Sequence, residues 1–138
     1  MPYETLDHTA DYGFSVHSNS LEGLFTESAQ ALFKEMVENF DDIVIEDCVE
    51  VELQEENLED LFISWLNELL FHFEAHRKLF RKFEVKIEED FKLHGKACGE
   101  EMDTHRHEMV IGIKSVTYHE LKIWKDEKGW HSRFICDV

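Results

Sequence analysis

Apolar and polar residues alternate with a period of two in several short stretches of the chain, as they do in half-buried strands. In the first stretch, Tyr12, Phe14 and Val16 alternate with glycine, serine and histidine. Further strands are predicted at residues 49–53, 83–87, 91–97, 109–116, 121–123 and 134–138. Turn residues at positions 89–90 and 126–129 indicate that two pairs of these strands form hairpins.

The period changes to that of a helix over residues 21–36 and again over residues 58–73. Asn19 and Ser20 precede the first of these segments and Asn57 precedes the second, and such side chains favour helix N-caps. The apolar stripe of the second segment is broad enough to pack on a sheet. We therefore expect an α+β fold, a two-layer sandwich in which two amphipathic helices pack on a mixed or antiparallel sheet.

The chain of 138 residues has the size of one domain, so residues 1–138 are expected to form a single unit. Its composition is 43% hydrophobic and 33% charged, with one proline, which argues against disordered linkers. The beginning of the sequence lacks the pattern of a secretion signal, and no stretch has the apolar length of a membrane span. Neither secretion nor membrane insertion is expected.

The three cysteines, Cys48, Cys98 and Cys136, are far apart, odd in number and free of any CxxC pair. This pattern suggests neither a disulfide framework nor a thiolate zinc site. A reducing cytoplasm fits it best.

Charge is distributed unevenly along a chain whose formal net charge is -17. Residues 1–76 carry one lysine and 19 acidic residues, whereas residues 77–138 carry 13 basic and 12 acidic residues. Phosphate backbones repel such an acidic surface, so stable direct binding to RNA or DNA is not expected. The acidic residues either attract a basic protein partner or metal ions, or they only keep the domain soluble.

Two aspartates stand at the ends of predicted strands. Asp11 lies at the entry of the first strand, and Asp137 points away from the core if Phe134 and Cys136 face it. If these strands are neighbours, Asp11, Asp137 and the carboxylate of Val138 gather oxygens that suit Ca²⁺ or Mg²⁺. The alternative is that both aspartates are solvated strand ends, and the spacing alone favours this alternative.

Other polar clusters give weaker signals. Glu68, His72 and His76 share a helix face, and His105 and His107 share a polar loop, but in both places solvated surface is the simpler interpretation.

The stretch from Lys114 through Thr117 to His119 combines a cation, a hydroxyl and an imidazole. Lys114 suits a phosphate or a partner's carboxylate, although a solvated strand lysine is the commoner case. The chain contains no P-loop, GxGxxG motif or nucleophile elbow, so catalysis by the protein alone is not expected.

Five segments in the same order resemble the archease family over nearly the whole chain: HTADYG, SLEGLFTESAQALF, LEDLFISWLNELLFHFE, HEMVIGIKSVTYHELKIWK and FICDV. The resemblance implies a cytoplasmic α+β protein that activates the GTP-dependent tRNA-splicing RNA ligase. Such an activator promotes guanylylation of the ligase, supports multiple turnover and broadens nucleotide use. It acts in tRNA splicing or RNA repair, as a protein cofactor and not as an enzyme.

The resemblance also implies roles for particular residues, and it reverses the preference for solvated strand ends. Asp11, Asp137 and Val138 match metal-binding positions of the family, with Ca²⁺ as the first expectation and Mg²⁺ or Mn²⁺ as alternatives. Lys114 matches a lysine used for activation. Three further residues match polar motif positions of the family and are expected only to shape the site: His8, Thr117 and His119.

Tyr12 departs from the family pattern, which more often has a small aliphatic residue there. Two other functions remain open: a chaperone or modulator of RNA-modification enzymes, and a metal-dependent phosphohydrolase or nucleotidyltransferase. The first requires an exposed apolar patch and the second requires turnover by the purified protein.

Overall fold

A computed structural model describes residues 3–7 and 12–138. The elements in these residues follow in the order β1 (Tyr3–Asp7), β2 (Tyr12–Ser18), α1 (Leu21–Met36), η1 (Phe40–Asp42), β3 (Asp47–Gln54), α2 (Leu58–His76), β4 (Lys78–Glu88), η2 (Glu89–Phe91), β5 (Lys92–Glu101), β6 (Ser115–Asp126) and β7 (Gly129–Asp137). Every pairing between these strands is antiparallel. The expected α+β class, with two helices packed on antiparallel strands, is confirmed.

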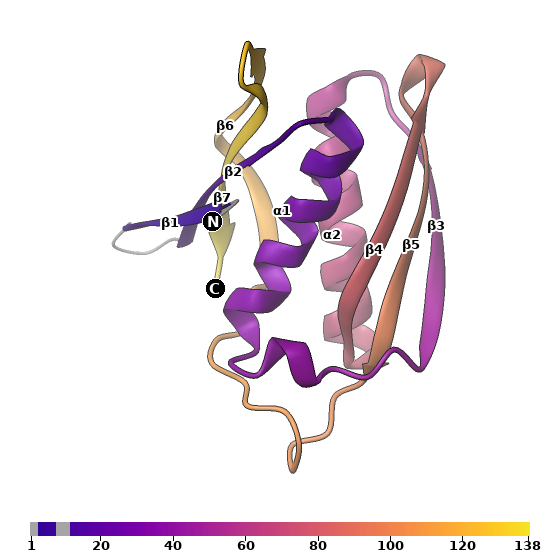
Figure 1. Cartoon of the computed structure of the whole chain (residues 1–138), viewed down its shortest axis with the longest axis vertical. Coiled ribbons are helices and arrows are strands. Elements are labelled where there is room, and N and C mark those ends of the chain that lie inside the picture. Colours follow the sequence, from indigo (N-terminus) through magenta and orange to yellow (C-terminus); the bar gives the residue numbers. More distant parts are fainter. Residues whose placement is uncertain (1–2, 8–11) are drawn as a thin grey trace.

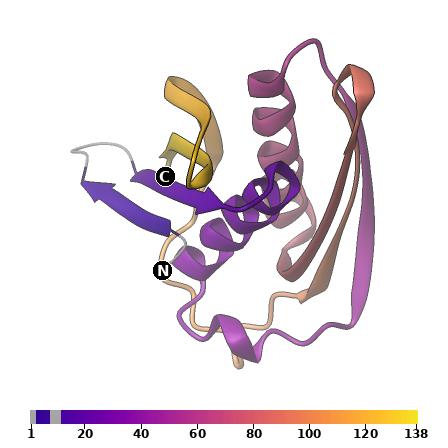
Figure 2. The same ribbon diagram turned by 45° about the horizontal axis from the view of Figure 1, so that its top comes forward.

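The described strands form two sheets, where the sequence pattern predicted one. The first has the order β1-β2-β7-β6 and the second the order β3-β5-β4. Figure 1 shows both helices in the space between the two sheets, and the turned view in Figure 2 shows the same arrangement. Periodicity reports which face of a strand is buried but not which strands are neighbours, so the division into two sheets was not visible in the sequence.

Side-chain caps fix the beginnings of both helices where the sequence predicted them. The Ser20 hydroxyl accepts a hydrogen bond from the Gly23 N–H at 2.9 Å, and the Asn57 side chain accepts one from the Asp60 N–H at 2.8 Å. Each bond satisfies one of the backbone donors that the first turn of a helix leaves unpaired. Helix α2 is terminated by Arg77, the residue after His76, which adopts the left-handed conformation with φ 56°.

Aromatic side chains fill the core on both sides of the helix layer. On the side of the four-stranded sheet, Phe14 stacks on Phe134 at 5.1 Å between ring centroids, and Phe62 of α2 meets Phe134 at 5.4 Å. On the other side, Phe33 of α1 meets Phe80 of β4 at 5.5 Å. All five rings are fully buried, so each helix buries apolar surface against both sheets.

Two strand predictions were wrong. Strand β1 was not predicted, because its short sequence YETLD gives little alternation to recognise. Residues 109–114 were predicted as strand, but they form only one isolated bridge, between Met109 and Val37, before β6 begins at Ser115. These residues connect the two sheets and pack against the end of α1. Every second one of them is at least partly buried, as in a strand, and this is why their pattern resembled a strand.

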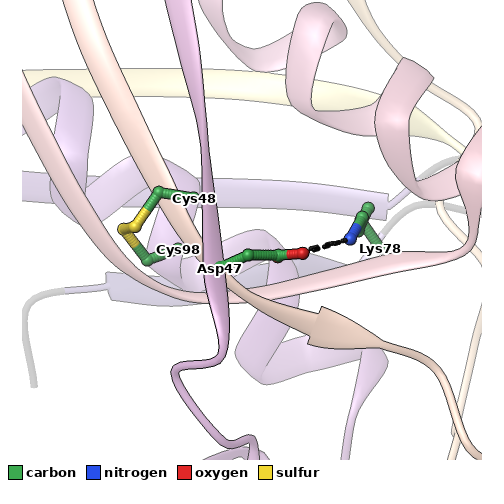
Figure 3. The surroundings of a disulfide bond; sticks show 4 residues. All are labelled: Asp47, Cys48, Lys78 and Cys98. Atoms are coloured by element: carbon green, nitrogen blue, oxygen red, sulfur yellow. Dashed lines mark hydrogen bonds and ion pairs between the residues drawn. A yellow bond between two sulfur atoms is a disulfide. The ribbon is translucent and has the colours of Figure 1, made fainter.

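Cys48 and Cys98 form a disulfide, so the expectation that no disulfide forms was wrong. The two residues lie directly opposite each other in β3 and β5, and Figure 3 shows the bond beside the ion pair between Asp47 and Lys78. The cysteines are 50 residues apart in sequence, and only the strand register brings them together. A reducing compartment therefore no longer follows from the cysteines. Cys136 is a buried free thiol.

The disulfide should contribute measurably to stability, because it closes a long loop in the unfolded chain. We expect reduction to lower the free energy of unfolding by about 2–4 kcal/mol. Urea denaturation with and without a reducing agent measures this difference. The double variant Cys48→Ser/Cys98→Ser is the control, since its stability should equal that of the reduced protein and ignore the reductant. An unchanged midpoint after reduction would contradict the prediction.

In the described part of the chain, neither helix has the combined length and apolar character needed to cross a membrane.

Candidate functional site

Strand β7 lies between β2 and β6, and this order brings distant parts of the sequence to one end of the four-stranded sheet. Tyr12 at the start of β2 pairs with Cys136, and Ser115 at the start of β6 pairs with Asp137. The neighbourhood of the first predicted strand and the C-terminal strand, on which the candidate metal site depended, is therefore confirmed. Figure 1 places this end near the label C.

Asp137 is exposed and is held mainly through its backbone. Its carbonyl oxygen accepts a hydrogen bond from the Lys114 N–H at 2.9 Å, and its carboxylate accepts one from the Ser115 hydroxyl at 3.3 Å. The Lys114 side chain is exposed and forms no ion pair with any described residue. The site therefore presents a carboxylate, a hydroxyl and an ammonium group to solvent.

Two predicted site residues, His8 and Asp11, lie outside the described residues. Val138 follows Asp137 and is 41% exposed. Within residues 3–7 and 12–138, no three metal-ligating side chains come together. The Asp137 carboxylate is the kind of oxygen donor that Ca²⁺, Mg²⁺ and Mn²⁺ prefer, so the described part of the site fits a hard cation but needs further oxygens to hold one.

Thr117 and His119 occupy different surroundings. The Thr117 hydroxyl donates to the Ile135 carbonyl at 3.0 Å, which ties β6 to β7. The pairing of these strands is interrupted between Thr117 and Lys122, and His119 lies in this bulge, 3.6 Å from the carboxylate of Glu120. The described contacts thus connect Thr117 to the strand that carries Asp137, whereas His119 contacts neither Asp137 nor Lys114.

Glu35 of α1 is a site neighbour that the sequence analysis missed. Its carboxylate accepts hydrogen bonds from the hydroxyls of Tyr3, at 3.1 Å, and Tyr12. Burial and the bonded carboxylate together raise the pKa of each tyrosine to about 12, so both hydroxyls stay protonated donors at neutral pH. Tyr12, the departure from the family pattern, therefore fastens the start of β2 to the helix.

Asn67 of α2 is a second residue that the sequence analysis missed. Its side chain forms hydrogen bonds with both backbone groups of Val116, at 2.7 and 3.0 Å. An amide within the broad apolar stripe of the second helix was the available signal, since a polar side chain there needs a partner. Asn67 thus joins the helix to the strand that begins beside Lys114.

The connection between the sheets, residues 102–114, is fastened to the rest of the protein at several points. The Glu38 N–H donates to the Glu108 carbonyl at 2.8 Å, and the Val110 N–H donates to the Met36 carbonyl at 2.8 Å. The side chain of Asn39 donates to the Arg106 carbonyl at 2.7 Å and accepts from the Glu108 N–H at 2.9 Å. Lys114 is therefore the last residue of a segment that is hydrogen-bonded to the end of α1 and to the residues that follow it.

A buried carboxylate anchors the first part of this connection. Glu100 accepts hydrogen bonds from Arg106, from the Val44 N–H at 2.7 Å and from His107 at 2.9 Å. Burial by itself raises the pKa of Glu100, but these hydrogen bonds outweigh burial and lower the pKa to about 2. Glu100 is therefore ionised at neutral pH and binds the connection to the segment before β3.

His107 was interpreted as part of a solvated loop, and that interpretation was wrong. Its side chain is fully buried, and its Nδ1 atom accepts a hydrogen bond from the Asp103 N–H at 2.9 Å. Because Nδ1 accepts, Nε2 carries the proton that is donated to Glu100.

The second histidine cluster that the sequence offered lies on α2. The Nε2 atom of His72 is 3.5 Å from a carboxylate oxygen of Glu68, and the ring centroids of His72 and His76 are 5.6 Å apart. No third ligand completes a metal site there among the described residues.

The comparison with known protein families agrees with the five quoted segments. The model of the archease protein family matches residues 3–138. The chain belongs to the archease family. Curated relatives named protein archease match it along their length: that of Methanopyrus kandleri is 37% identical and covered completely, as is this chain. That of Pyrococcus abyssi is 38% identical, with 99% of this chain and 98% of the relative covered.

Two solved structures have the same archease fold. The solution structure of protein 1598 of Methanobacterium thermoautotrophicum has a TM-score of 0.83 and 33% identity, with 99% of each chain covered. The crystal structure of an archease from Thermotoga maritima, described as a possible chaperone, has a TM-score of 0.65. It is 23% identical, with 98% of this chain and 96% of that chain covered, and it supports the fold alone.

Proposed function

We propose that this protein activates a GTP-dependent tRNA-splicing RNA ligase by promoting guanylylation of the ligase. The observation that carries the proposal is the meeting of β2, β7 and β6, which places Asp137, Ser115 and Lys114 together at one exposed end of a sheet. Membership of the archease family supports it. On this proposal the protein also supports repeated turnover, broadens nucleotide use and has no catalytic activity of its own.

The exposed groups suit a reaction in which a triphosphate enters the ligase. Asp137, together with Asp11 and Val138, would hold a divalent ion, with Ca²⁺ the first choice and Mg²⁺ or Mn²⁺ the alternatives. Such an ion neutralises developing charge on phosphate oxygens. Lys114 supplies a positive charge for phosphate, and Thr117 keeps the neighbouring strands in register. His8 and His119 shape the edge of the site.

The charge of the chain supports an action on the ligase and not on free RNA. Residues 1–76 carry 19 acidic residues and one lysine, which suits contact with a basic, RNA-binding protein and disfavours stable binding to RNA itself. We place the protein in the cytoplasm because tRNA ligation is its proposed context.

Ligase guanylylation with labelled GTP tests the proposal directly. A limiting amount of the RNA ligase from the same organism is incubated with divalent metal, with and without this protein. We expect faster and repeated guanylylation in the presence of the protein, because each ligase molecule is returned to its active state. Bovine albumin at the same concentration controls for nonspecific protein effects. Equal guanylylation with and without the folded protein would overturn the proposal.

A second candidate function is that of a chaperone or modulator of RNA-modification enzymes. It is supported by exposed apolar side chains such as Phe71, 54% exposed, and Val110, 61% exposed. It predicts that the native protein binds a hydrophobic dye and suppresses aggregation of unrelated proteins. The ligase activator needs neither property, so these two assays separate the candidates.

A further inference from the structure

The side chain of Asn67 binds Val116 much as a neighbouring strand would. Its Nδ2 donates to the Val116 carbonyl at 3.0 Å, and its Oδ1 accepts from the Val116 N–H at 2.7 Å. A carboxamide offers a donor and an acceptor side by side, so one side chain satisfies both backbone groups of one residue. Both bonds are partly buried, and Val116 itself is 3% exposed.

This contact lies at an edge that the sheet leaves unpaired. Strand β6 is the outer strand in the order β1-β2-β7-β6, so its far edge has no strand partner in the described fold. Buried backbone groups at such an edge need another partner, and α2 provides it through Asn67. Val116 is thus held from two sides, by its pairing with Cys136 of β7 and by the helix.

The fixed residue directly follows the exposed groups of the candidate site. Ser115 donates its hydroxyl to the Asp137 carboxylate, and the Lys114 N–H donates to the Asp137 carbonyl. Neither contact reaches the side chain of Lys114, which is exposed. The position of this ammonium group therefore depends on how firmly the backbone at Val116 is held.

We propose that Asn67 is a positioning residue for the activating site: its amide fixes Val116 against α2 and so sets where Lys114 and Ser115 lie relative to Asp137. The inference rests on the proposed function, and it assigns a role to a residue that touches neither ligase nor nucleotide. Helix α2 thereby contributes to the site although none of the exposed site groups belongs to it.

Asn39 provides a matched control within the same protein. Its amide also binds one backbone carbonyl and one backbone N–H, those of Arg106 and Glu108, at 2.7 and 2.9 Å. These bonds hold the connection well before Lys114, where the backbone bonds of Glu38 and Val110 hold it as well. Loss of the Asn39 amide removes this pair of bonds, together with an exposed one to the Asp42 carboxylate at 3.2 Å, without releasing the start of β6.

The test compares Asn67→Leu with Asn39→Ala. Leucine has the branched shape of asparagine and does not lower the helix propensity of position 67, but it forms neither hydrogen bond. We expect Asn67→Leu to lower the maximal stimulation of guanylylation about tenfold, as for a displaced positioning group, with little change in the half-saturating concentration. Amide hydrogen exchange at residues 114–117 should accelerate by a similar factor. Asn39→Ala should leave both quantities close to wild type.

Asn67→Asp adds an isosteric variant that keeps the acceptor for the Val116 N–H but turns a carboxylate oxygen toward the Val116 carbonyl. Its stimulation should also fall, which ties the effect to the hydrogen bond and not to side-chain size. Unchanged exchange at residues 114–117 in Asn67→Leu, or equal losses of stimulation in Asn67→Leu and Asn39→Ala, would overturn the positioning role. A wild-type protein that fails to stimulate the ligase would overturn the proposed function, and the exchange result would still decide whether Asn67 holds this segment.

Discussion

Asp137→Ala is expected to reduce activation of ligase guanylylation by about 100-fold or more, the size of effect seen when one group is removed from a site that stabilises developing charge. The carboxylate is exposed, and its one hydrogen bond from a described side chain comes from the Ser115 hydroxyl at 3.3 Å. Its removal should therefore change the free energy of unfolding by no more than about 0.5 kcal/mol. The measurement is the rate of label transfer from GTP to the ligase at saturating activator.

Three companion variants make this result specific. Asp137→Asn keeps the shape and removes the charge, so it should fail like alanine. Asp11→Ala should fail as well if both aspartates serve one ion. Asp41→Ala removes an exposed carboxylate of η1, which is not one of the strands that form the candidate site, and should activate normally. Normal activation by both Asp137→Ala and Asp11→Ala would refute the metal-site mechanism.

Glu100→Ala is expected to cause the largest loss of stability among the substitutions considered. The carboxylate is 4% exposed and binds Arg106, His107 and the Val44 N–H, and the fully buried His107 ring would lose the partner of its Nε2–H. Hydrogen bonds to a charged group contribute about 1.5–3 kcal/mol each, so the loss of this set costs about 3–5 kcal/mol. Urea denaturation at pH 7 measures the loss. Glu101→Ala, at the exposed neighbouring position, should cost less than about 0.5 kcal/mol.

The same carboxylate makes part of the stability dependent on pH. The pKa of Glu100 is about 2 in the folded protein and 4.5 without these contacts, as in the unfolded chain. The contribution of Glu100 to the free energy of unfolding is therefore complete above pH 4.5. It is lost as the pH falls from 4.5 toward 2, because the unfolded chain takes up the proton first. After allowance for screening, the loss is about 2 kcal/mol. In Glu100→Ala this part of the acid dependence should disappear; an identical acid profile in both proteins would contradict the assignment.

The sequence predicted those features that repeat along one element. The helical period and the caps at Ser20 and Asn57 located both helices, because these signals are local. It did not predict which strands are neighbours, so the two sheets and the pairing of Cys48 with Cys98 were missed. Strand pairing brings together residues that are distant in sequence, and the pattern of one strand does not show which strand lies beside it.

The candidate site shows the same limit. Strand alternation suggested an outward Asp137, and the order of β2 and β7 then placed the start of β2 beside the strand that carries Asp137. The sequence could not reveal the partners of Glu35 and Asn67, because each side chain binds to strands from another part of the chain. His107 was misjudged for a similar reason: its burial depends on Glu100 and on the folding of the connection around it.

The strand order also sets the sequence of events during synthesis of the chain. Residues 47–101 contain α2 and the whole three-stranded sheet, whose pairings are formed between segments that leave the ribosome close together. Strand β2 is made early but pairs with β7, which is made last of all the elements, and slow non-local pairing must wait for it. We therefore expect one half of the protein to be folded on the ribosome while β2 still lacks β7, its neighbour on the side away from β1. Nascent chains that stop before β7 would have a folded three-stranded sheet but no candidate site, because Asp137 belongs to β7. Activation of the ligase would therefore begin only after the whole chain has been translated.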